Sequence, residues 1–241
     1  AGGSIGSELC RQIIRLKPHK LVLIELNEFT LYKINEELNT LNKSLGIISL
    51  LANVQDQEKL EIIFDTFKVD TVYHAAAYKH VPLVEENICE GVKNNVFSTL
   101  AVANASVIKK VSNLVLISSD KAVRPTNIMG ITKRFSEICT LAIKEKYNNS
   151  ITKSSIVRFG NVLGSSGSVI PLFLTQLKEN KPLTVTHPSV TRYFMTIKDA
   201  VGLVLQATYI SVGGEIFVLD MGKPVKINDI AKKLIHLSGV S

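Results

Sequence analysis

Cysteine is scarce in this sequence, and the spacing of its cysteines suits neither disulfides nor metal. The chain of 241 residues has 3 cysteines and no CxxC pair. Because an odd, widely spaced set is poor material for a disulfide framework, a reducing compartment is the natural interpretation. His80 has no second metal ligand at a recognisable spacing, so we predict no metal site.

Long hydrophobic runs and clusters of basic residues are also absent. No apolar stretch approaches the roughly 18 residues of a membrane span, and no signal peptide is evident. The net charge is +7, but Lys and Arg are scattered without interleaved aromatics, which argues against nucleic acid. An anionic small molecule or an acidic membrane surface is the better candidate. We expect this segment to be soluble and cytoplasmic.

What the sequence does contain is an alternation of short β-rich runs with longer helical patterns. This alternation, with 46% hydrophobic residues, predicts an α/β fold with a doubly wound parallel sheet of the Rossmann type. The predicted strands are 20–25, 46–52, 71–76, 113–118, 154–160 and 214–220. The predicted helices are 4–15, 29–42, 56–67, 88–108, 128–147, 168–179, 197–210 and 227–238.

A glycine-rich turn opens the first predicted helix, and an acid closes the next strand. In dinucleotide-binding units such glycines let the backbone approach a pyrophosphate at a helix N-terminus, and the acid binds the adenosine ribose, which favours NAD over NADP. An ordinary tight turn is the alternative. The residues we assign to NAD here are Gly3, Ser4, Ile5, Gly6 and Glu25.

The two ends of the sequence suggest a part of a longer protein. The chain opens inside a strand-to-helix turn, with no strand before it, and closes just after a helical pattern. We therefore expect residues 1–160 to form an NAD-binding Rossmann domain whose first strand is missing. Residues 161–241 are expected to form a substrate-binding region that is interleaved with the last strands and incomplete at its C-terminus.

Small and polar residues follow two of the predicted strands. Ala75, Ala76 and Ala77 stand after "TVYH", where small side chains permit close passage of a cofactor, although plain sheet packing is the alternative. "SDK" at 119–121 follows "NLVLIS", at the sheet edge where open α/β folds place their chemistry. A helix cap with a solvated charge pair would explain that tripeptide equally well.

Two residues farther along the chain favour a catalytic role for residues 119–121 over a helix cap. Met129 and Lys133 are one helical turn apart and share a helix face. Lys133 can then reach a cofactor ribose while Met129 packs beside the substrate.

The second half of the chain has two candidate substrate loops. "VRFGNVLGSSGSVIP", 157–171, offers backbone N–H groups to a phosphate or a uracil edge, with a flexible loop without ligand as an equal alternative. "TVTHPSVTRYFMTIKDA", 184–200, places Arg192 beside aromatics, an arrangement suited to a diphosphate or a stacked base. A solvated arginine is the alternative there.

Taken together, these motifs resemble the nucleotide-sugar 4,6-dehydratases of the extended short-chain dehydrogenase/reductase superfamily, over nearly the whole chain. The closest group is the CapD/WbpM/PglF-like polysaccharide biosynthesis family. The motifs that carry the resemblance are "GGSIGSEL", "HAAAYKHVPLVEEN", "DKAVRPTNIMGITKR", "VRFGNVLGSSGSVIP", "VTHPSVTRYFM" and "GEIFVLDMGKPVKI". Most short-chain dehydrogenases have tyrosine where Met129 stands, and a thioether cannot transfer a proton. The larger members of this family have methionine, so Met129 fits the group.

The resemblance implies bound NAD and a UDP-N-acetylhexosamine substrate, usually UDP-GlcNAc, converted to a UDP-4-keto-6-deoxy sugar. The product serves capsule, O-antigen (lipopolysaccharide) or protein glycosylation. The family's Thr-Asp-Lys corresponds to Ser119, Asp120 and Lys121, and the acid of its Gly-Asp-Val segment to Asn53, which keeps an acceptor but loses the charge. Further cofactor candidates are Val54, Asn95 and Lys133. The substrate candidates are Lys79, His80, Asn161, Gly167, Ser168, Val169, Thr186 and Arg192.

Such a reaction needs C4 of the sugar oxidised first, because a ketone there acidifies the C5 hydrogen. The hydride removed from C4 returns to C6, so there is no net redox change. We assign Lys121 as the C5 base, Asp120 as the acid for the C6 hydroxyl, Ser119 to the C4 oxygen and Lys133 to the nicotinamide ribose. These roles require a neutral Lys121 and a protonated Asp120, the opposite of their usual states in water. They therefore require a pocket that excludes water. Asp120, Lys121 or a water could deprotonate the C4 hydroxyl.

Two other functions stay open. A 4-epimerase, or a dehydratase that inverts C5, suits the same fold, although epimerases normally need the absent tyrosine. A non-catalytic NAD-binding module is the third possibility, and the presence of both Asp120 and Lys121 argues against it. We expect a homo-oligomer. Related proteins often have N-terminal membrane helices, which allows a parent protein anchored in the inner membrane with this segment facing the cytoplasm.

Overall fold

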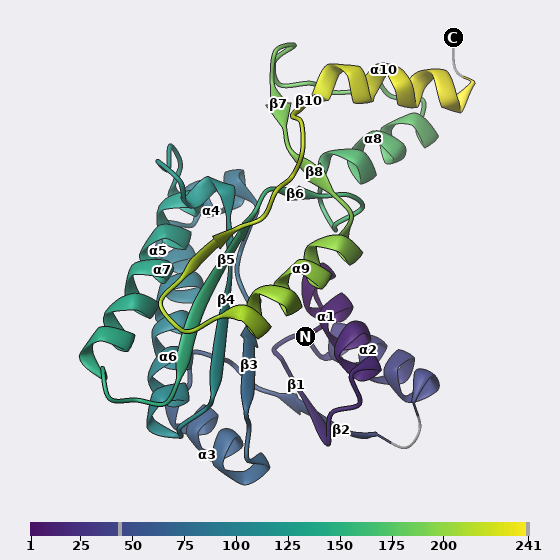
Figure 1. The fold of residues 1–241 in the computed structure, drawn as a ribbon. Helices are drawn as coiled ribbons and strands as arrows, with labels where there is room; N and C mark the ends of the chain where they lie inside the picture. Colours follow the sequence, from purple (N-terminus) through teal and green to yellow (C-terminus); the bar gives the residue numbers. More distant parts are fainter. Residues whose placement is uncertain (43–44, 240–241) are drawn as a thin grey trace.

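Parallel strands alternate with helices in the computed structural model, which describes residues 1–42 and 45–239 (Figure 1). The first elements are α1 (Ser4–Arg15), β1 (Lys20–Glu25), α2 (Glu28–Leu41), β2 (Gly46–Leu51), α3 (Gln57–Phe67) and β3 (Thr71–His74). They are followed by α4 (Val81–Glu86), α5 (Ile88–Val92), the π-helical η1 (Lys93–Phe97), α6 (Ser98–Ile108), β4 (Asn113–Ser119), the 3-10 turn η2 (Asp120–Ala122), α7 (Ile128–Lys146) and β5 (Lys153–Phe159).

The last part of the chain contains shorter strands. Its elements are β6 (Asn161–Val162), α8 (Val169–Lys178), β7 (Thr191–Arg192), β8 (Phe194–Met195), α9 (Ile197–Ile210), β9 (Ile216–Val218), β10 (Val225–Lys226) and α10 (Ile227–Ser238). Every predicted strand and helix is present, with ends shifted by a few residues. The sequence did not predict α4 or the short strands, because a few residues carry no readable periodicity. The predicted helix 88–108 is interrupted by the π-helical turn.

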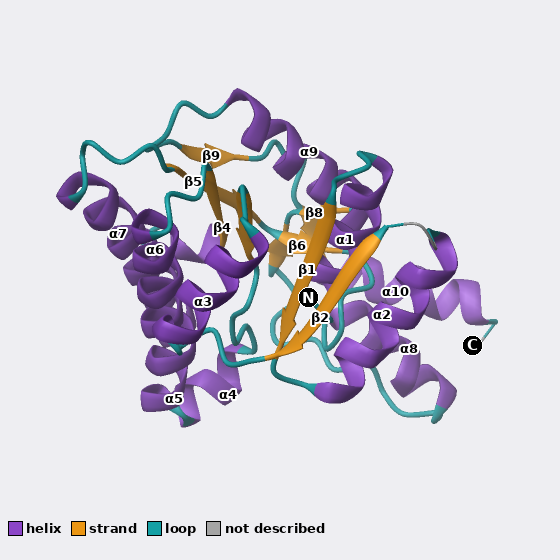
Figure 2. Cartoon of the chain, turned by 90° about the horizontal axis from the view of Figure 1, so that it is seen from below, coloured by secondary structure: helices purple, strands orange, loops and turns teal. Residues whose placement is uncertain are grey.

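The sheet confirms the predicted α/β class. β3, β4, β5 and β9 lie side by side in that order and all run parallel, and β1 runs parallel to β2. Helices cover both faces. Leu114 of β4 packs with α3 and α6, whereas the next residue, Val115, packs with α1 and α9. This alternation follows from the opposite directions of successive side chains in a strand, and Figure 2 shows the helices on the two sides.

The sheet consists of two hydrogen-bonded parts. Among the described residues, β1 pairs only with β2, and β3 is the edge of the four-stranded part. The N-terminal nitrogen of Ala1 donates to the carbonyl oxygen of Ile24 at 2.9 Å, so the chain enters alongside β1. The strand that the sequence led us to expect before the glycine turn remains a prediction.

Residues after 160 divide between a small unit and the main sheet. α8 and α10 pack on each other through Phe173, Ile227 and Ala231, and β7 pairs antiparallel with β10. Figure 1 shows this unit above the carboxyl ends of the strands. Helix α9 and strand β9 return to the main sheet, so the domain boundary at residue 160 stays a prediction. No helix in the described part of the chain is both long and apolar enough to cross a membrane.

Candidate active site

The tip of β4 brings together four residues that the sequence singled out. Ser119 Oγ accepts a hydrogen bond from the Lys121 amide at 3.2 Å and lies 2.9 Å from Asp120 Oδ1, to which it donates. Lys121 Nζ lies 3.2 Å from the same Asp120 oxygen. It also donates at 3.4 Å to Oδ1 of Asn161, the first residue of β6, which lies two residues after the end of β5. A hydroxyl, a carboxylate, an amine and an amide therefore form one connected polar group.

This polar group is partly open to water. The side chains of Lys121 and Asp120 are 28% and 38% exposed. The dry surroundings that the assigned proton transfers require are therefore not supplied by these described residues alone. A bound sugar would have to exclude the water.

Two glycines let neighbouring elements approach this group closely. A Cβ built on Gly130, in the first turn of α7, would overlap the carbonyl oxygen of Lys121. A Cβ on Gly160, after β5, would lie 3.0 Å from Asp120 Oδ2. Both glycines stand inside quoted motifs, but the sequence alone did not show what they contact.

Helix α7 carries the other two predicted catalytic residues behind the strand tip. Lys133 is buried, and its Nζ donates to the carbonyl oxygen of Ile117 in β4 at 2.6 Å. Burial lowers the pKa of Lys133 to about 8. Met129 is 3% exposed, so its side chain is part of the packed first turn of α7 and not of an open pocket wall. The helix begins at Asn127, whose side chain accepts from the Gly130 amide at 2.8 Å.

Asn95 forms hydrogen bonds to the loop 75–80, which follows β3. Its Oδ1 accepts from the Tyr78 amide at 2.7 Å, and its Nδ2 donates to the Tyr78 carbonyl at 2.9 Å and to Thr132 Oγ1 at 2.9 Å. Asn95 lies in η1, and single π-helical turns often mark functional sites. Because both amide hydrogens are engaged within the chain, Asn95 holds the loop 75–80 in place, and its role in NAD binding remains a prediction. That loop contains the predicted alanines, Lys79 and His80.

The glycine turn at the start of α1 has the features of an anion site. Gly3 is the N-cap and makes no side-chain cap bond, so the first amides of α1 are available to a ligand. A Cβ on Gly3 would meet nothing within 4 Å, which leaves room beside the turn. Ser4 and Ile5 follow in the first turn. These features fit a dinucleotide pyrophosphate.

Glu25 is tied to the same turn. It accepts from the Gly2 amide at 2.7 Å and from the Leu26 amide at 3.0 Å. A carboxyl group held by backbone amides thus stands beside the turn, as expected for a ribose-binding residue.

The glycine-serine loop of the second half reaches back to the first half. The Ser166 amide donates to Ser4 Oγ at 3.2 Å. Gly167 has φ of +68°, and a Cβ there would overlap the ring of His80. Ser168 is the N-cap of α8, Val169 is its first residue, and the cap makes no side-chain bond. These contacts bring a group of predicted substrate residues near the glycine turn at the start of α1: His80, Gly167, Ser168 and Val169.

The other predicted residues lie in the loop before β7, in β7 itself and in the loop after β2. Thr186 and Arg192 are exposed, and the Arg192 guanidinium donates to the neighbouring Thr191 carbonyl at 2.9 Å. Asn53 follows β2, and its Oδ1 accepts from the Gln55 amide at 3.0 Å. Val54 packs at the edge of the core around α3 and α6. The binding roles of these residues remain predictions.

Sequence reasoning missed a buried ionic cluster behind the site. Glu137 of α7 is fully buried and accepts from Ser118, Arg134 and Arg158. Its position one helical turn after Lys133 could have shown that it faces β4. Its partners on the strands could not be read from the sequence, because they depend on tertiary packing.

Comparisons with known proteins decide the family. Residues 1–241 match the family described as "Polysaccharide biosynthesis protein". The chain belongs to this family. It is 51% identical over 240 residues to the capsular polysaccharide biosynthesis protein CapD of Staphylococcus aureus, covering 99% of this chain and 40% of CapD. It is also 42% identical over 166 residues to a UDP-glucose 4-epimerase of Rickettsia bellii, covering 68% of this chain and 49% of that protein.

Solved structures confirm the fold of this family member. Pen from Bacillus thuringiensis aligns with a TM-score of 0.93 at 34% identity, covering 98% of this chain and 72% of that chain. The dTDP-glucose 4,6-dehydratase DesIV of Streptomyces venezuelae, crystallised with NAD, aligns with a TM-score of 0.86 at 20% identity, covering 100% and 80%. At that identity the second likeness concerns the fold alone. The chain spans 40% of the length of CapD.

The close approach at Gly130 predicts an unfavourable substitution. Alanine is the better helix former by about 1 kcal/mol, but its methyl would overlap the Lys121 carbonyl, so Gly130→Ala should lower the free energy of unfolding by about 1–3 kcal/mol. Gly202→Ala is the matched control, because in α9 the nearest atom lies at 3.8 Å. The control should be neutral or stabilising in urea unfolding. A stabilising effect at both positions would contradict the packing described.

The buried amine predicts a pH-dependent stability difference. Burial lowers the pKa of Lys133 from 10.5 to about 8, so its charge destabilises the fold fully below about pH 8 and progressively less up to pH 10.5. As the pH rises from about 8 to 10.5, the free energy of unfolding of the native chain should therefore increase relative to that of Lys133→Met. Urea unfolding at a series of pH values measures the difference, with the exposed Lys232→Met as control. If the difference in free energy of unfolding between the native chain and Lys133→Met does not change with pH, the pKa of Lys133 is not lowered by burial.

Proposed function

We propose that the protein containing this chain is a UDP-N-acetylglucosamine 4,6-dehydratase, an NAD-dependent lyase that makes a UDP-4-keto-6-deoxy-hexosamine. The observation that carries the proposal is the connected polar group at the tip of β4, formed by Ser119, Asp120, Lys121 and Asn161. Lys133 lies behind this group, and Met129 stands where most short-chain dehydrogenases have tyrosine. Family membership supports a role in polysaccharide biosynthesis. Capsule, O-antigen and protein glycosylation all remain possible destinations of the product.

The cofactor is assigned on the fit of the glycine turn. The uncapped amides at Gly3–Gly6 would hold the pyrophosphate, Glu25 the adenosine ribose and Lys133 the nicotinamide ribose. Bound NAD would supply reversible oxidation at C4 of the sugar by accepting a hydride and returning it to C6.

The remaining steps fall to the side chains of the chain itself. Ser119 Oγ would bind the C4 oxygen, Lys121 would remove the C5 proton, and Asp120 would protonate the leaving C6 hydroxyl. Lys121 Nζ and Asp120 Oδ1 are 3.2 Å apart, so the proton taken from C5 can pass to the group that donates at C6. The proton released from the C4 hydroxyl would be returned to C5 as the hydride adds to C6, so the protons balance. Asn161 accepts from Lys121 and would hold the amine toward the sugar.

A 4-epimerase is the second candidate, because a relative of that description is 42% identical over 68% of this chain. Epimerisation returns the hydride to C4 and needs no acid at C6. The buried Met129 offers no proton donor or acceptor at the place where such enzymes use a phenol, and the Asp120–Lys121 pair would be unnecessary. The product decides between them, since a 4-keto-6-deoxy sugar comes from dehydration alone.

The proposal predicts the behaviour of the two central variants. With UDP-GlcNAc and the full-length protein, Asp120→Asn and Lys121→Ala should each lower kcat for the 4-keto product by about 100-fold or more while NAD still binds. Loss of NAD binding together with activity would instead indicate a misfolded site.

The exposed ion pair of α3 gives the matched control. Asp65 and Lys68 lie 2.8 Å apart on the surface, so Asp65→Asn and Lys68→Ala should turn over like the native protein. Native-like kcat in either variant of Asp120 or Lys121 would exclude the assigned roles. NAD binding by the native protein without turnover of UDP-GlcNAc would favour the non-catalytic module.

We also propose that the protein is a homo-oligomer that associates through the outer face of α7. Ile131, Phe135 and Ile138 lie on one exposed face of this helix, and exposed Phe97 and Ile88 come from the adjoining η1 and α5. An apolar surface of this kind, made by neighbouring elements, is typical of protein contacts. The membrane anchor of a parent protein and the cytoplasmic location of this segment remain predictions.

Charge placed on this face should separate the subunits. Phe135→Glu should shift the mass measured by light scattering from a multiple of the subunit mass to that of one subunit. Tyr209→Glu, at an exposed aromatic of α9, should leave the mass unchanged. A native protein that is monomeric, or a Phe135→Glu variant with the native mass, would contradict this association.

A further inference from the structure

A fully buried carboxylate lies behind the candidate active site. Glu137 is 0% exposed, and it stands one turn after Lys133 on the same face of α7. Both of its oxygens are engaged. Oε1 accepts from Ser118 Oγ at 2.6 Å and from Arg158 Nε at 2.7 Å, and Oε2 accepts from Arg158 at 2.6 Å and from Arg134 at 3.0 Å. The charge is thus compensated by a bidentate arginine and two further donors.

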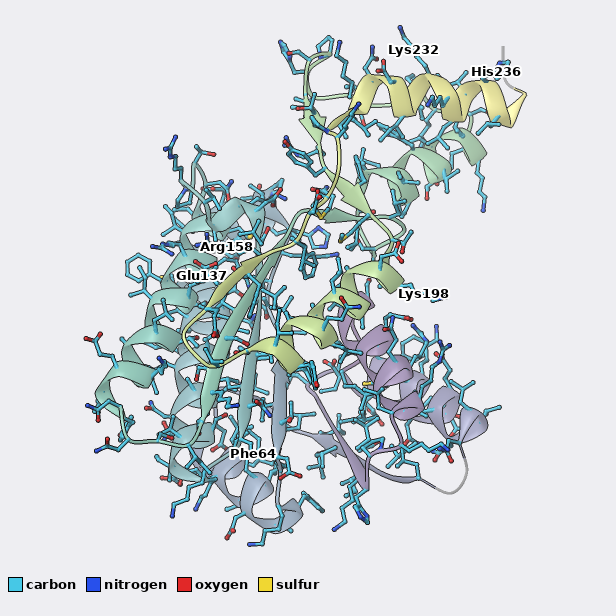
Figure 3. All side chains as sticks on the ribbon, in the orientation of Figure 1. Phe64, Glu137, Arg158, Lys198, Lys232 and His236 are labelled. Atoms are coloured by element: carbon cyan, nitrogen blue, oxygen red, sulfur yellow. The ribbon has the colours of Figure 1, made fainter. Side chains whose placement is uncertain are left out.

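The partners of Glu137 belong to the two strands that lead into the site. Ser118 directly precedes Ser119 at the tip of β4, and Arg158 lies in β5 two residues before Gly160, which faces the Asp120 carboxylate. Figure 3 labels Glu137 and Arg158 next to each other where α7 faces β5. Together with the bond from Lys133 to Ile117, α7 fixes two consecutive residues at the end of β4.

Stability alone is a weak explanation for such a cluster. Moving charges out of water costs nearly as much as their pairing returns, and apolar residues of similar size often stabilise a fold as well. A bidentate ion pair, in contrast, fixes the relative orientation of two elements, which apolar packing does not. The orientation that Glu137 fixes is that of the strand ends carrying Asp120 and Asn161.

We propose that Glu137 is a positioning residue for the dehydration: through Ser118 and Arg158 it holds the ends of β4 and β5 so that Asp120, Lys121 and Lys133 face the sugar and the cofactor in one geometry. The inference rests on the proposed function. Glu137 is buried behind the strands and contacts neither the open side of the site nor the glycine turn. Its effect should therefore appear in the chemical step and not in binding.

The test compares Glu137→Gln with a core variant remote from the site, Ile63→Val in α3, in the full-length protein at a temperature where both are folded. Glu137→Gln should lower kcat on the order of tenfold or more, with KM for UDP-GlcNAc and Kd for NAD changed less than about threefold. Arg158→Lys keeps the charge but loses the bidentate contact and should behave in the same way. Ile63→Val should keep the native kcat. Equal kcat in Glu137→Gln and Ile63→Val would overturn the proposal.

A second readout does not depend on the reaction. Amide hydrogen exchange of residues 119–123 should be faster in Glu137→Gln than in Ile63→Val, because glutamine offers one uncharged acceptor oxygen in place of two and so holds Ser118 and Arg158 more weakly. If the native protein shows no dehydration, the proposed function fails, and exchange alone then decides: faster exchange supports the positioning role, and unchanged exchange overturns it.

Discussion

The contact of helix α7 with the end of β4 is the constraint on which the rest of the site depends. Gly130 lets the first turn of the helix lie against the Lys121 carbonyl. In the next two turns, Lys133 donates to the Ile117 carbonyl and Glu137 accepts from the Ser118 hydroxyl. A strand end would otherwise be free to fray. Here it is fixed at successive residues, so the short turn with Asp120 and Lys121 leaves the sheet in a defined direction. The polar group at the tip is therefore a product of helix packing.

The same packing explains how a methionine can occupy the position of a phenol. Met129 lies in the buried first turn of α7, where an apolar side chain supports the contact with the strand end. Proton transfer then has to come from residues outside the helix. Asp120 and Lys121 are neighbours at the strand tip and partly exposed to solvent, and in the proposed function they supply both the acid and the base.

Much of the fold could be predicted from the sequence, because apolar runs and turn residues determine strands such as 113–119 locally. The candidate site was predictable where its residues are adjacent in sequence, as Ser119, Asp120 and Lys121 are. The role of Asn95 as a clamp on Tyr78, the contact of Gly167 with His80 and the cluster around Glu137 could not be predicted. Each joins segments far apart in the chain, and only the folded structure determines which segments meet.

The central claim is that Asp120 and Lys121 act on C5 and C6 of a nucleotide sugar. A crystal structure of the full-length protein with NAD and UDP-GlcNAc tests it most directly. The account predicts that Lys121 Nζ lies within about 3.5 Å of C5 and an Asp120 oxygen within hydrogen-bond distance of the C6 hydroxyl, with C4 facing the nicotinamide. A sugar bound with C5 and C6 remote from both side chains would contradict it.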